Sequence, residues 1–524
     1  MSFIRSVTTV GSYTLLSRIT GFVRDVLTAT YLGAGATADA FFIAFQFPNL
    51  FRSLFAEGAF AAGFVPIFTK TLARDGKEQA KQFADEAFAV LAAALLVFSV
   101  IMIIAMPVVL YVMAPGFADI PGQMERTTEL ARIAFPYLFF VSLTSLQSGV
   151  LNAFDRFAAA AFAPVLLNLT LIAAILAGVG AKGDPALFLA WGVFIAGVVQ
   201  FFWLAQDCKR IGMRFRLKMP KLTPEVKLLL ARMFPVMIGA GIYQLNLVVN
   251  KIVATLVSEG AVSWLYYADR VNLLPVGIIG YAIGVALVPV LTRHLQNGDT
   301  AAALADQNRA LELSLLLTVP AAVGIAMLAE PITSVLFERG AFSATDREAV
   351  AAALMAFSFG LPAYVLNKAL TPGFFSRGDT KTPVQAAFAA FIVCVALNLG
   401  LMNVLGHVGI ALATSVSAWL NITILAVALY RREQLVPDER LTRGVPKIII
   451  AAVLMGLALW GGTWAVATYV GPIFGTPDGP SGPLAIRSVV LIGLIVGGAF
   501  VFAGAILATG AASFADIRRL RRRS

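Results

Sequence analysis

Long apolar runs separated by short polar loops extend over almost the whole chain. A helix needs roughly 20 mostly apolar residues to cross the hydrocarbon core of a bilayer. Fourteen segments reach that length and are predicted to be transmembrane helices: 5–32, 37–68, 86–114, 130–152, 158–180, 186–206, 228–257, 264–292, 310–337, 348–375, 383–404, 408–430, 446–470 and 485–510. Several contain Gly or Pro, so tilts and kinks are expected. The pattern predicts an all-α polytopic membrane protein with fourteen transmembrane helices.

The loops between these segments alternate in charge. One set carries clustered Lys and Arg, as in KTLARDGKEQAK, CKRIGMRFRLKMPKLTPEVK and the tail RRLRRRS. The other set is short or poor in these residues, as in GAGATA, SEGAVS and GPIFGTPDGPSGP. Because basic loops favour the cytoplasmic side of a membrane, both termini are expected to be cytoplasmic. The N-terminus shows no cleavable signal-peptide pattern, so it is expected to begin the first span.

The chain looks like two related halves followed by an addition. One offset aligns five positions of the first half with five of the second: Asn49 with Asn272, Leu50 with Leu273, Pro66 with Pro289, Thr69 with Thr292 and Lys70 with Arg293. Six spans in each half give the repeats the same orientation, which predicts a pseudo-two-fold axis along the membrane normal and a cavity between two lobes. Chance similarity of two helix ends is the alternative.

This repeat sets the expected domain boundaries. The parts are an N-lobe (1–206), a basic cytoplasmic linker (207–227), a C-lobe (228–431), a second cytoplasmic linker (432–445), a C-terminal helix pair (446–510) and a basic cytoplasmic tail (511–524).

Composition narrows the function. The chain is 59% hydrophobic and 13% charged, whereas soluble domains average about 25% charged residues. Its net charge of +11 comes from short loops, so nucleic-acid binding is not expected. Two Cys and two His are too few for a disulfide framework or a His-built metal centre. No GxxxxGK[ST] motif is present, and no cofactor is expected.

Ionisable residues inside the predicted spans are the candidate site. A charge at a helix centre costs about 2.5–3.5 kcal/mol on the lenient insertion scale, so these residues should face a wet cavity or one another. They are Arg18, Arg24, Asp25, Asp39, Arg52 and Glu57 in the first two spans, and Asp269 and Arg270 in the eighth. Helical spacing places Ser17 with Arg24, Arg18 with Asp25, and Asn49 with Arg52 on shared faces.

Two interpretations of these charges remain open. In the first, the residues only form buried ion pairs, Arg24 with Asp39 or Glu57 and Arg270 with Asp269. In the second, the arginines bind a multiply charged anion, because the guanidinium fork matches phosphate oxygens. The four arginines exceed what neutralisation needs, which favours the second.

The stretch SRITGFVRDVLTATYLGAGATADAFFIAFQFPNLFRSLFAEGAFAAGFVPIF closely resembles the N-terminal signature of the MviN/MurJ family. Members are lipid II flippases within the multidrug/oligosaccharidyl-lipid/polysaccharide exporter superfamily. The segments YYADRVNLLPVGIIGYAIGVALVPVL and NKALTPGFFSRGDTKTPV also match the family pattern. The resemblance covers the whole chain and implies two six-helix lobes with a C-terminal pair that forms a groove for the lipid tail.

The resemblance implies a transporter and not an enzyme. Its substrate would be lipid II, the undecaprenyl-diphosphate-linked peptidoglycan precursor, moved by alternating access from the cytoplasmic to the periplasmic leaflet for cell-wall synthesis and cell shape. A flippase for another polyprenyl-diphosphate-linked oligosaccharide, of O-antigen or capsule type, is the alternative. A membrane enzyme acting on polyprenyl lipids would need catalytic clusters in sizeable loops, and a cell-wall scaffold would leave the buried arginines unexplained.

The resemblance also implies roles for the charged residues. Arg18, Arg24, Arg52 and Arg270 would bind the diphosphate head group, with Asp25, Asp39, Glu57 and Asp269 as acidic partners and Ser17 and Asn49 in support. The protein is expected to be a monomer in the bacterial inner membrane that contacts membrane lipids and cell-wall synthesis proteins. Its transport would be driven by the membrane potential or an ion. A metal site is left open. Some members have a sodium site with carboxylates in the seventh and eleventh spans, and this chain has Asn250 and Asn398 in those spans.

Overall fold

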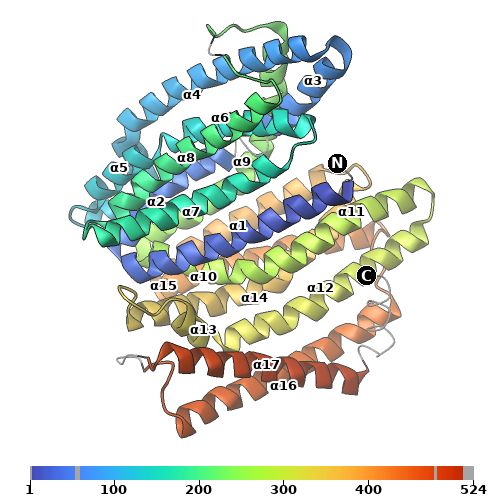
Figure 1. The fold of residues 1–524 in the computed structure, drawn as a ribbon. Coiled ribbons are helices and arrows are strands. Elements are labelled where there is room, and N and C mark those ends of the chain that lie inside the picture. The colour runs from blue at the N-terminus through green and yellow to red at the C-terminus, as the bar shows by residue number, and fades with distance from the viewer. Residues whose placement is uncertain (1–2, 54–59, 217, 477–480, 511–524) are drawn as a thin grey trace. The chain divides into compact units, whose positions relative to one another are not determined.

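The computed structural model describes residues 3–53, 60–216, 218–476 and 481–510 (Figure 1). Within these ranges the chain forms helices and loops, and no β-strand occurs among them. The all-α prediction is therefore confirmed. Contacts divide the chain into two compact units, Met1–Ser263 and Trp264–Ser524.

The first unit is a bundle in which α7 packs against both α1 and α8 (Figure 1). Stacked phenylalanines support its core, since the rings of Phe60, Phe68 and Phe83 lie 5.0–5.4 Å from that of Phe64. Its elements are α1 (Phe3–Leu32), α2 (Ala36–Phe51), α3 (Phe60–Asp75), α4 (Lys77–Met113), the 3₁₀ turn η2 (Pro115–Asp119), α5 (Gln123–Ala134), α6 (Tyr137–Ala153), α7 (Ala158–Gly180), α8 (Pro185–Arg210) and α9 (Pro224–Val257).

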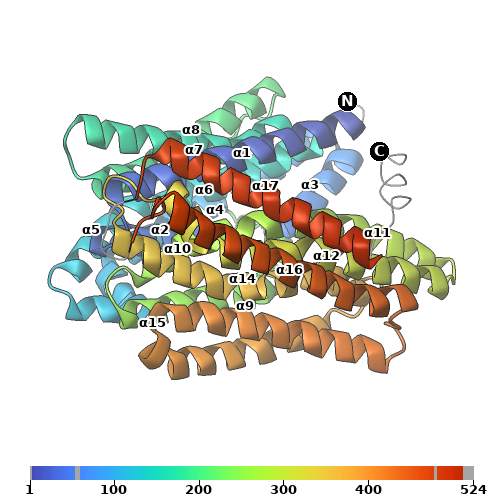
Figure 2. The same ribbon diagram turned by 90° about the horizontal axis from the view of Figure 1, so that it is seen from below.

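The second unit ends in two helices that lie side by side, α16 and α17 (Figure 2). Its elements are α10 (Ala261–Pro275), which begins at the end of the first unit, the π-helical turn η3 (Val276–Gly280), α11 (Tyr281–Gln296), α12 (Thr300–Met327), α13 (Ala329–Leu336), α14 (Ala344–Phe375), α15 (Lys381–Arg431), α16 (Glu439–Tyr469) and α17 (Leu484–Thr509). Gly406, at φ 56°, kinks α15 into two helices that match the predicted spans 383–404 and 408–430.

Side-chain caps explain where several of these helices begin. Asp184 accepts a hydrogen bond from the Ala186 N–H at the start of α8, and Asp438 accepts one from Leu441 at the start of α16. Ser343 and Asp346 form a reciprocal capping box at the start of α14. Each cap satisfies backbone donors that the first helical turn leaves without partners.

The membrane-spanning character of the chain is clear from helix length and hydropathy. Ten helical segments in the described ranges are long and apolar enough to cross a bilayer. The fourteen predicted ranges overlap helices within the described residues, but they do not match them one to one. Four ranges are divided between two helices: 37–68 between α2 and α3, 130–152 between α5 and α6, 264–292 between α10 and α11, and 310–337 between α12 and α13. The chain is therefore a polytopic membrane protein.

The boundary between the two compact units lies after Ser263, whereas the expected boundary between the lobes was the linker 207–227. The cause is α9, which packs on α3 and α4 of the first unit. Gly63 of α3 lies against Leu229 and Met233 of α9, close enough that a Cβ would be 3.0 Å from Leu229. Thr223, just before α9, donates to Glu86 of α4 at 2.9 Å. These contacts attach α9 to the first unit.

The internal repeat has a structural counterpart. With the offset read from the sequence, α2 corresponds to α10 and α3 to α11. Each pair is interrupted at the same place, because Arg52 and Ser53 after α2 and residues 276–280 after α10 have π-helical hydrogen bonding. Such turns frequently occur at functional positions in helices, and one of them carries Arg52.

A buried charged cluster fastens the C-terminal helix pair to the rest of the second unit. Arg347 of α14 has no exposed surface and lies 3.1 Å from Glu338 and 3.4 Å from Glu330. Its Nη2 donates to the Thr476 carbonyl at 2.7 Å, in the loop between α16 and α17. Arg487 of α17 contacts the same Glu338 at 3.4 Å. The cluster therefore joins α14 and α17 through shared carboxylates.

A second ionic contact organises the loop between α14 and α15. Asp379 accepts hydrogen bonds from the Lys381 and Thr382 N–H groups at the start of α15 and from Arg432 Nη1 at 2.7 Å, where this helix ends. Hydrogen bonds from Thr382 and then Arg432 hold the pKa of Asp379 well below its usual range. The loop thus ties the two ends of α15 together.

The depressed pKa of Asp379 predicts a pH-dependent contribution to stability. A carboxylate whose folded-state pKa is lowered stabilises the fold above its unfolded-state pKa, about 3.9, and loses that effect as pH falls through the folded-state pKa. We expect Asp379→Asn to lower the melting temperature by a constant amount above about pH 5. The difference from wild type should shrink below about pH 4. A difference that stays the same at both ends of a pH series would contradict this.

Candidate functional site

Arg24 lies on α1 where this helix packs against α7. Its Nη2 donates to Asp25 Oδ1 at 2.6 Å, and its Nη1 donates to Asn168 Oδ1 at 3.0 Å. The Arg24 and Asp25 side chains are only 11% and 5% exposed. A guanidinium in an apolar helix is costly unless such partners satisfy it. These contacts hold the Arg24 guanidinium in a defined orientation.

Asn168 is a site residue that the sequence did not single out. Its amide donates to the Ser17 carbonyl at 2.9 Å while its oxygen accepts from Arg24. A Cβ on Gly21 would lie 3.3 Å from the amide nitrogen, so the glycine allows the close approach of α7. The available signal was a polar residue within the apolar run AAAAFAPVLLNLTLIAAILAG.

The Ser17 carbonyl and the Arg24 side chain both contact Asn168, so this part of α1 lies against α7. The shared face of Arg18 and Asp25 stays a prediction, and the two residues differ in burial. Arg18 is exposed and forms no hydrogen bond or ion pair with any residue that the structure describes, whereas Asp25 is buried beside Arg24. The first helix thus presents one fixed arginine and one accessible arginine.

The shared face of Asn49 and Arg52 is also confirmed. Arg52 donates from Nε and Nη2 to Asn49 Oδ1 at 3.0 and 2.9 Å. Arg52 begins the π-helical turn after α2, and its neighbour Ser53 accepts a hydrogen bond from Gln244 of α9 at 2.6 Å. The position of this arginine is therefore coupled to the packing of α9.

Asp39 has a structural environment that differs from the one expected for an arginine partner. It is fully buried at the start of α2, and its carboxylate accepts from the Gly260 N–H and the Ser263 N–H, each at 2.7 Å. The Ser263 hydroxyl donates to the same carboxylate. These donors belong to the N-terminus of α10, where a negative charge is favoured. In this arrangement Asp39 latches α2 to α10.

The latch predicts the effect of Asp39→Asn. The amide would place a donor against backbone N–H groups, leaving a buried donor unsatisfied at a cost of about 1–3 kcal/mol. We expect a lower melting temperature in detergent, with Glu259→Gln as a control because Glu259 accepts from Ala36 at an exposed position nearby. An unchanged melting temperature for Asp39→Asn would contradict the latch.

The second unit contributes Arg270 and Asp269 on α10. The Arg270 guanidinium lies over the Tyr266 ring, 4.7 Å from its centroid, which is a cation–π contact. Asp269 is the adjacent residue on the same helix. Glu57, the remaining acidic residue of the expected set, lies outside the described residues.

The two asparagines at the positions of the sodium site, and the possible metal-ligating groups, can be located in the described chain. No group of three or more His, Cys, Asp or Glu side chains that could hold an ion occurs within the described part of the chain. Asn250 donates to Asn246 at 3.1 Å, and Asn398 is buried near Cys394. Both amides therefore take part in contacts within their own helices.

Comparison with known proteins gives these features a context. The sequence model of the family described as "Lipid II flippase MurJ" matches residues 28–475. A probable lipid II flippase MurJ of Rhizobium meliloti (strain 1021) is 41% identical over 524 residues, covering 99% of this chain and 96% of that protein. The chain belongs to the MurJ family. A Rhizobium tropici member, also named a probable lipid II flippase MurJ, is 45% identical over 460 residues, 87% of this chain and 86% of its own length.

Solved structures agree with the MurJ fold. A lipid II flippase MurJ in an inward closed conformation aligns with a TM-score of 0.77 at 23% identity, covering 95% of this chain and 99% of that one. An inward-facing multidrug resistance MATE family transporter of the MOP superfamily aligns with a TM-score of 0.66 at 15% identity, covering 81% and 98%. The chain thus shares its fold with both of these solved structures.

Proposed function

We propose that this chain is a lipid II flippase and not an enzyme. Its function is to move the undecaprenyl-diphosphate-linked peptidoglycan precursor from the cytoplasmic to the periplasmic leaflet. The observation that carries the proposal is Arg24, a buried arginine oriented by Asp25 and Asn168 in the first helix of a MurJ family member. A diphosphate is an anion for which such a guanidinium is suited.

In the proposed mechanism Arg24, Arg52 and Arg270 bind the diphosphate, and the exposed Arg18 is available to an approaching head group. Asp25 and Asn49 hold Arg24 and Arg52 when no substrate is bound. The substrate's negative charge then replaces these contacts and favours closure of the lobes around it. Asp269, Glu57 and Ser17 complete the set as supporting residues.

Transport proceeds by alternating access of two six-helix lobes, with fourteen transmembrane helices in all. The positive-inside pattern supports cytoplasmic termini in an inner membrane. The driving force is the membrane potential or an ion, and the working unit is a monomer that contacts membrane lipids and cell-wall synthesis proteins.

The C-terminal helix pair would accommodate the lipid tail. Glycines of α16 and α17 differ in their surroundings, and a Cβ on Gly461, Gly493 or Gly497 would meet nothing within 4 Å. By contrast, a Cβ on Gly498 would lie 2.9 Å from Leu459, where the two helices pack. The open glycines give the pair a shallow apolar surface suited to a polyprenyl chain.

Depletion of the protein in its own cell tests this function. Access to lipid II from the periplasmic side is then measured, with wild-type protein supplied as rescue. We expect access to fall on depletion and to return with the wild type. If periplasmic access to lipid II does not change on depletion, in a cell without a second flippase, the proposal is contradicted. Another polyprenyl-diphosphate-linked oligosaccharide would then be favoured as the substrate.

A further inference from the structure

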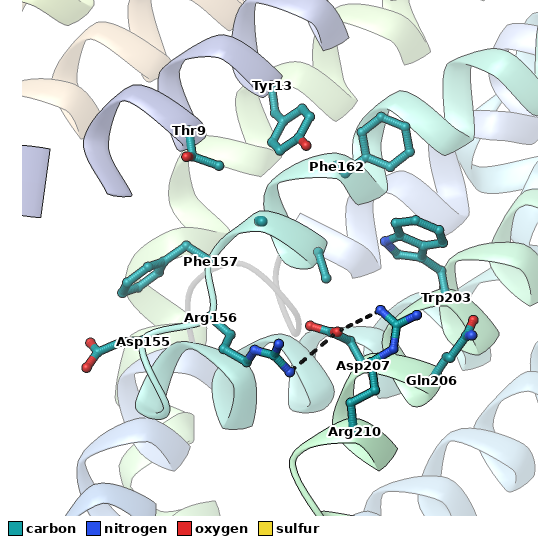
Figure 3. A pocket seen from close by; sticks show the side chains of 12 residues that line it. Thr9, Tyr13, Asp155, Arg156, Phe157, Phe162, Trp203, Gln206, Asp207 and Arg210 are labelled. Atoms are coloured by element: carbon teal, nitrogen blue, oxygen red, sulfur yellow. Dashed lines mark hydrogen bonds and ion pairs between the residues drawn. The ribbon is translucent and has the colours of Figure 1, made fainter. Parts of the chain in front are cut away.

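A cavity of about 330 Å³ opens in the first unit, away from Arg24 (Figure 3). It lies among the beginning of α1, the turn before α7 and the end of α8. Its volume is at the lower end of the range of about 300–1,000 Å³ for small-molecule pockets. The space therefore suits a head group of a larger molecule, or a small ligand. The lining side chains that matter are Tyr13, Asp155, Arg156, Phe162, Trp203, Gln206, Asp207 and Arg210.

The floor of this cavity is cationic. Asp207 lies between two arginines, 3.6 Å from Arg156 Nη1 and 3.4 Å from Arg210 Nη1 (Figure 3). Both contacts are long and use a single nitrogen of each guanidinium, which has five N–H donors. One carboxylate against two guanidiniums leaves an excess of one positive charge. The floor can therefore accept one phosphodiester.

The rim carries a carboxylate of its own. Asp155 is exposed, and its carboxylate forms no hydrogen bond or ion pair with any residue in the described part of the chain, whereas its backbone N–H donates to the Asn152 carbonyl at 3.1 Å. Its φ of 56° is in the left-handed region, which a short polar side chain tolerates better than most. The turn thus presents an acceptor beside the cationic floor, and the four charged side chains sum to zero.

The wall above the floor is aromatic. The rings of Tyr13 and Phe162 lie 5.3 Å apart, and those of Phe162 and Trp203 lie 5.5 Å apart. Trp203 is 42% exposed, as expected of a tryptophan at a membrane interface. The Tyr13 hydroxyl and the Gln206 amide have no side-chain partner among the described residues, so both can bind a polar ligand.

An apolar stripe leads from this wall along α7. Phe162, Leu169 and Leu176 are spaced by seven residues and share one face of the helix. Leu169 is 45% exposed and Leu176 is 50% exposed. Exposed leucines along a membrane helix offer acyl chains a surface. This stripe favours a lipid over a water-soluble ligand.

We propose that this cavity binds the head group of a zwitterionic phospholipid that carries a primary ammonium, as in phosphatidylethanolamine. Arg156 and Arg210 hold the phosphodiester, Asp155 accepts from the ammonium, and the chains follow α7. The site is separate from the proposed lipid II site and lies between the basic loops at 155–157 and 207–227, on the side that the positive-inside rule makes cytoplasmic. A lipid with a net negative charge fits less well, because Asp155 would repel it.

The test uses the full-length protein in nanodiscs of phosphatidylethanolamine, phosphatidylcholine or phosphatidylglycerol. Native mass spectrometry counts the retained lipid, and a photoreactive phosphatidylethanolamine locates it. We expect preferential retention of phosphatidylethanolamine and cross-links to the peptides that contain Tyr13 and Phe162. The Arg156→Ala/Arg210→Ala variant should lose about tenfold in affinity, because charge-assisted hydrogen bonds to the phosphate are removed.

Asp155→Asn is the sharper variant, since Asn also tolerates the left-handed backbone. It should abolish the preference for phosphatidylethanolamine over phosphatidylcholine while phosphate binding remains. Arg74→Ala and Asp75→Asn are the matched controls, because this exposed pair lies at the end of α3, outside the cavity. Should the double arginine variant fail to fold, Arg210→Gln replaces it, as Arg210 is 64% exposed.

Three outcomes would overturn the proposal. Retention of phosphatidylglycerol equal to or above that of phosphatidylethanolamine would assign the site to anionic lipids. Equal retention by wild type and the arginine variants would show that the cavity is not the site. Displacement of the lipid by soluble phosphoethanolamine at equal concentration would assign it to a water-soluble ligand.

Discussion

Replacing Arg24 by alanine is expected to abolish lipid II transport while the protein still inserts and folds. The guanidinium bridges Asp25 and Asn168 and is 11% exposed, so these two partners hold it in a defined orientation. A lost charge-assisted contact to the diphosphate corresponds to about tenfold to hundredfold in affinity. Periplasmic access to lipid II in depleted cells measures the effect, with membrane levels of the two proteins matched.

Two further variants make this prediction specific. Arg24→Lys should rescue only in part, because an ammonium lacks the planar fork that matches phosphate. Arg74→Ala should transport normally, since Arg74 also precedes an aspartate and pairs with it at 2.9 Å but is 75% exposed. Normal transport by the Arg24→Ala protein would contradict a role for this arginine in binding.

The helices could be predicted from the sequence because one physical requirement dominates them. A bilayer demands long apolar segments, and the predicted ranges overlap helices within the described residues, although four of them are divided between two helices. The membership of α9 in the first unit could not be predicted in this way. It depends on contacts such as Gly63 with Leu229, which hydropathy does not encode.

The candidate site was predictable only where its contacts are local. Helical periodicity placed Asn49 with Arg52, and the hydrogen bond between their side chains confirms this shared face. Asn168 escaped notice because it is 144 residues from Arg24. Asp39 likewise depends on donors more than 220 residues away, at the start of α10. Long-range partners of this kind follow from the fold and not from spacing.

Arg347→Ala is expected to destabilise the second unit by about 3–5 kcal/mol, the cost of breaking a buried ion pair by removing one partner. Arg347 has no exposed surface, and its loss would leave Arg487 as the one cationic partner of Glu338 among the described residues and free the Thr476 carbonyl. The loop between α16 and α17 would then lose its attachment to α14.

Gly475 lies against the Arg347 guanidinium, so substitution of this glycine is also expected to destabilise the second unit. Gly475 has φ 97°, and a Cβ there would overlap the guanidinium, so Gly475→Ala should destabilise through strain and displacement of Arg347. Thermal unfolding in detergent, followed by size-exclusion chromatography, measures both variants. Arg443→Ala is the control, because its pair with Glu439 on α16 is 74% and 73% exposed and should be worth only about 0.3–0.5 kcal/mol. Equal melting temperatures for the Arg347 and Arg443 variants would show that the buried cluster does not hold the helix pair in place.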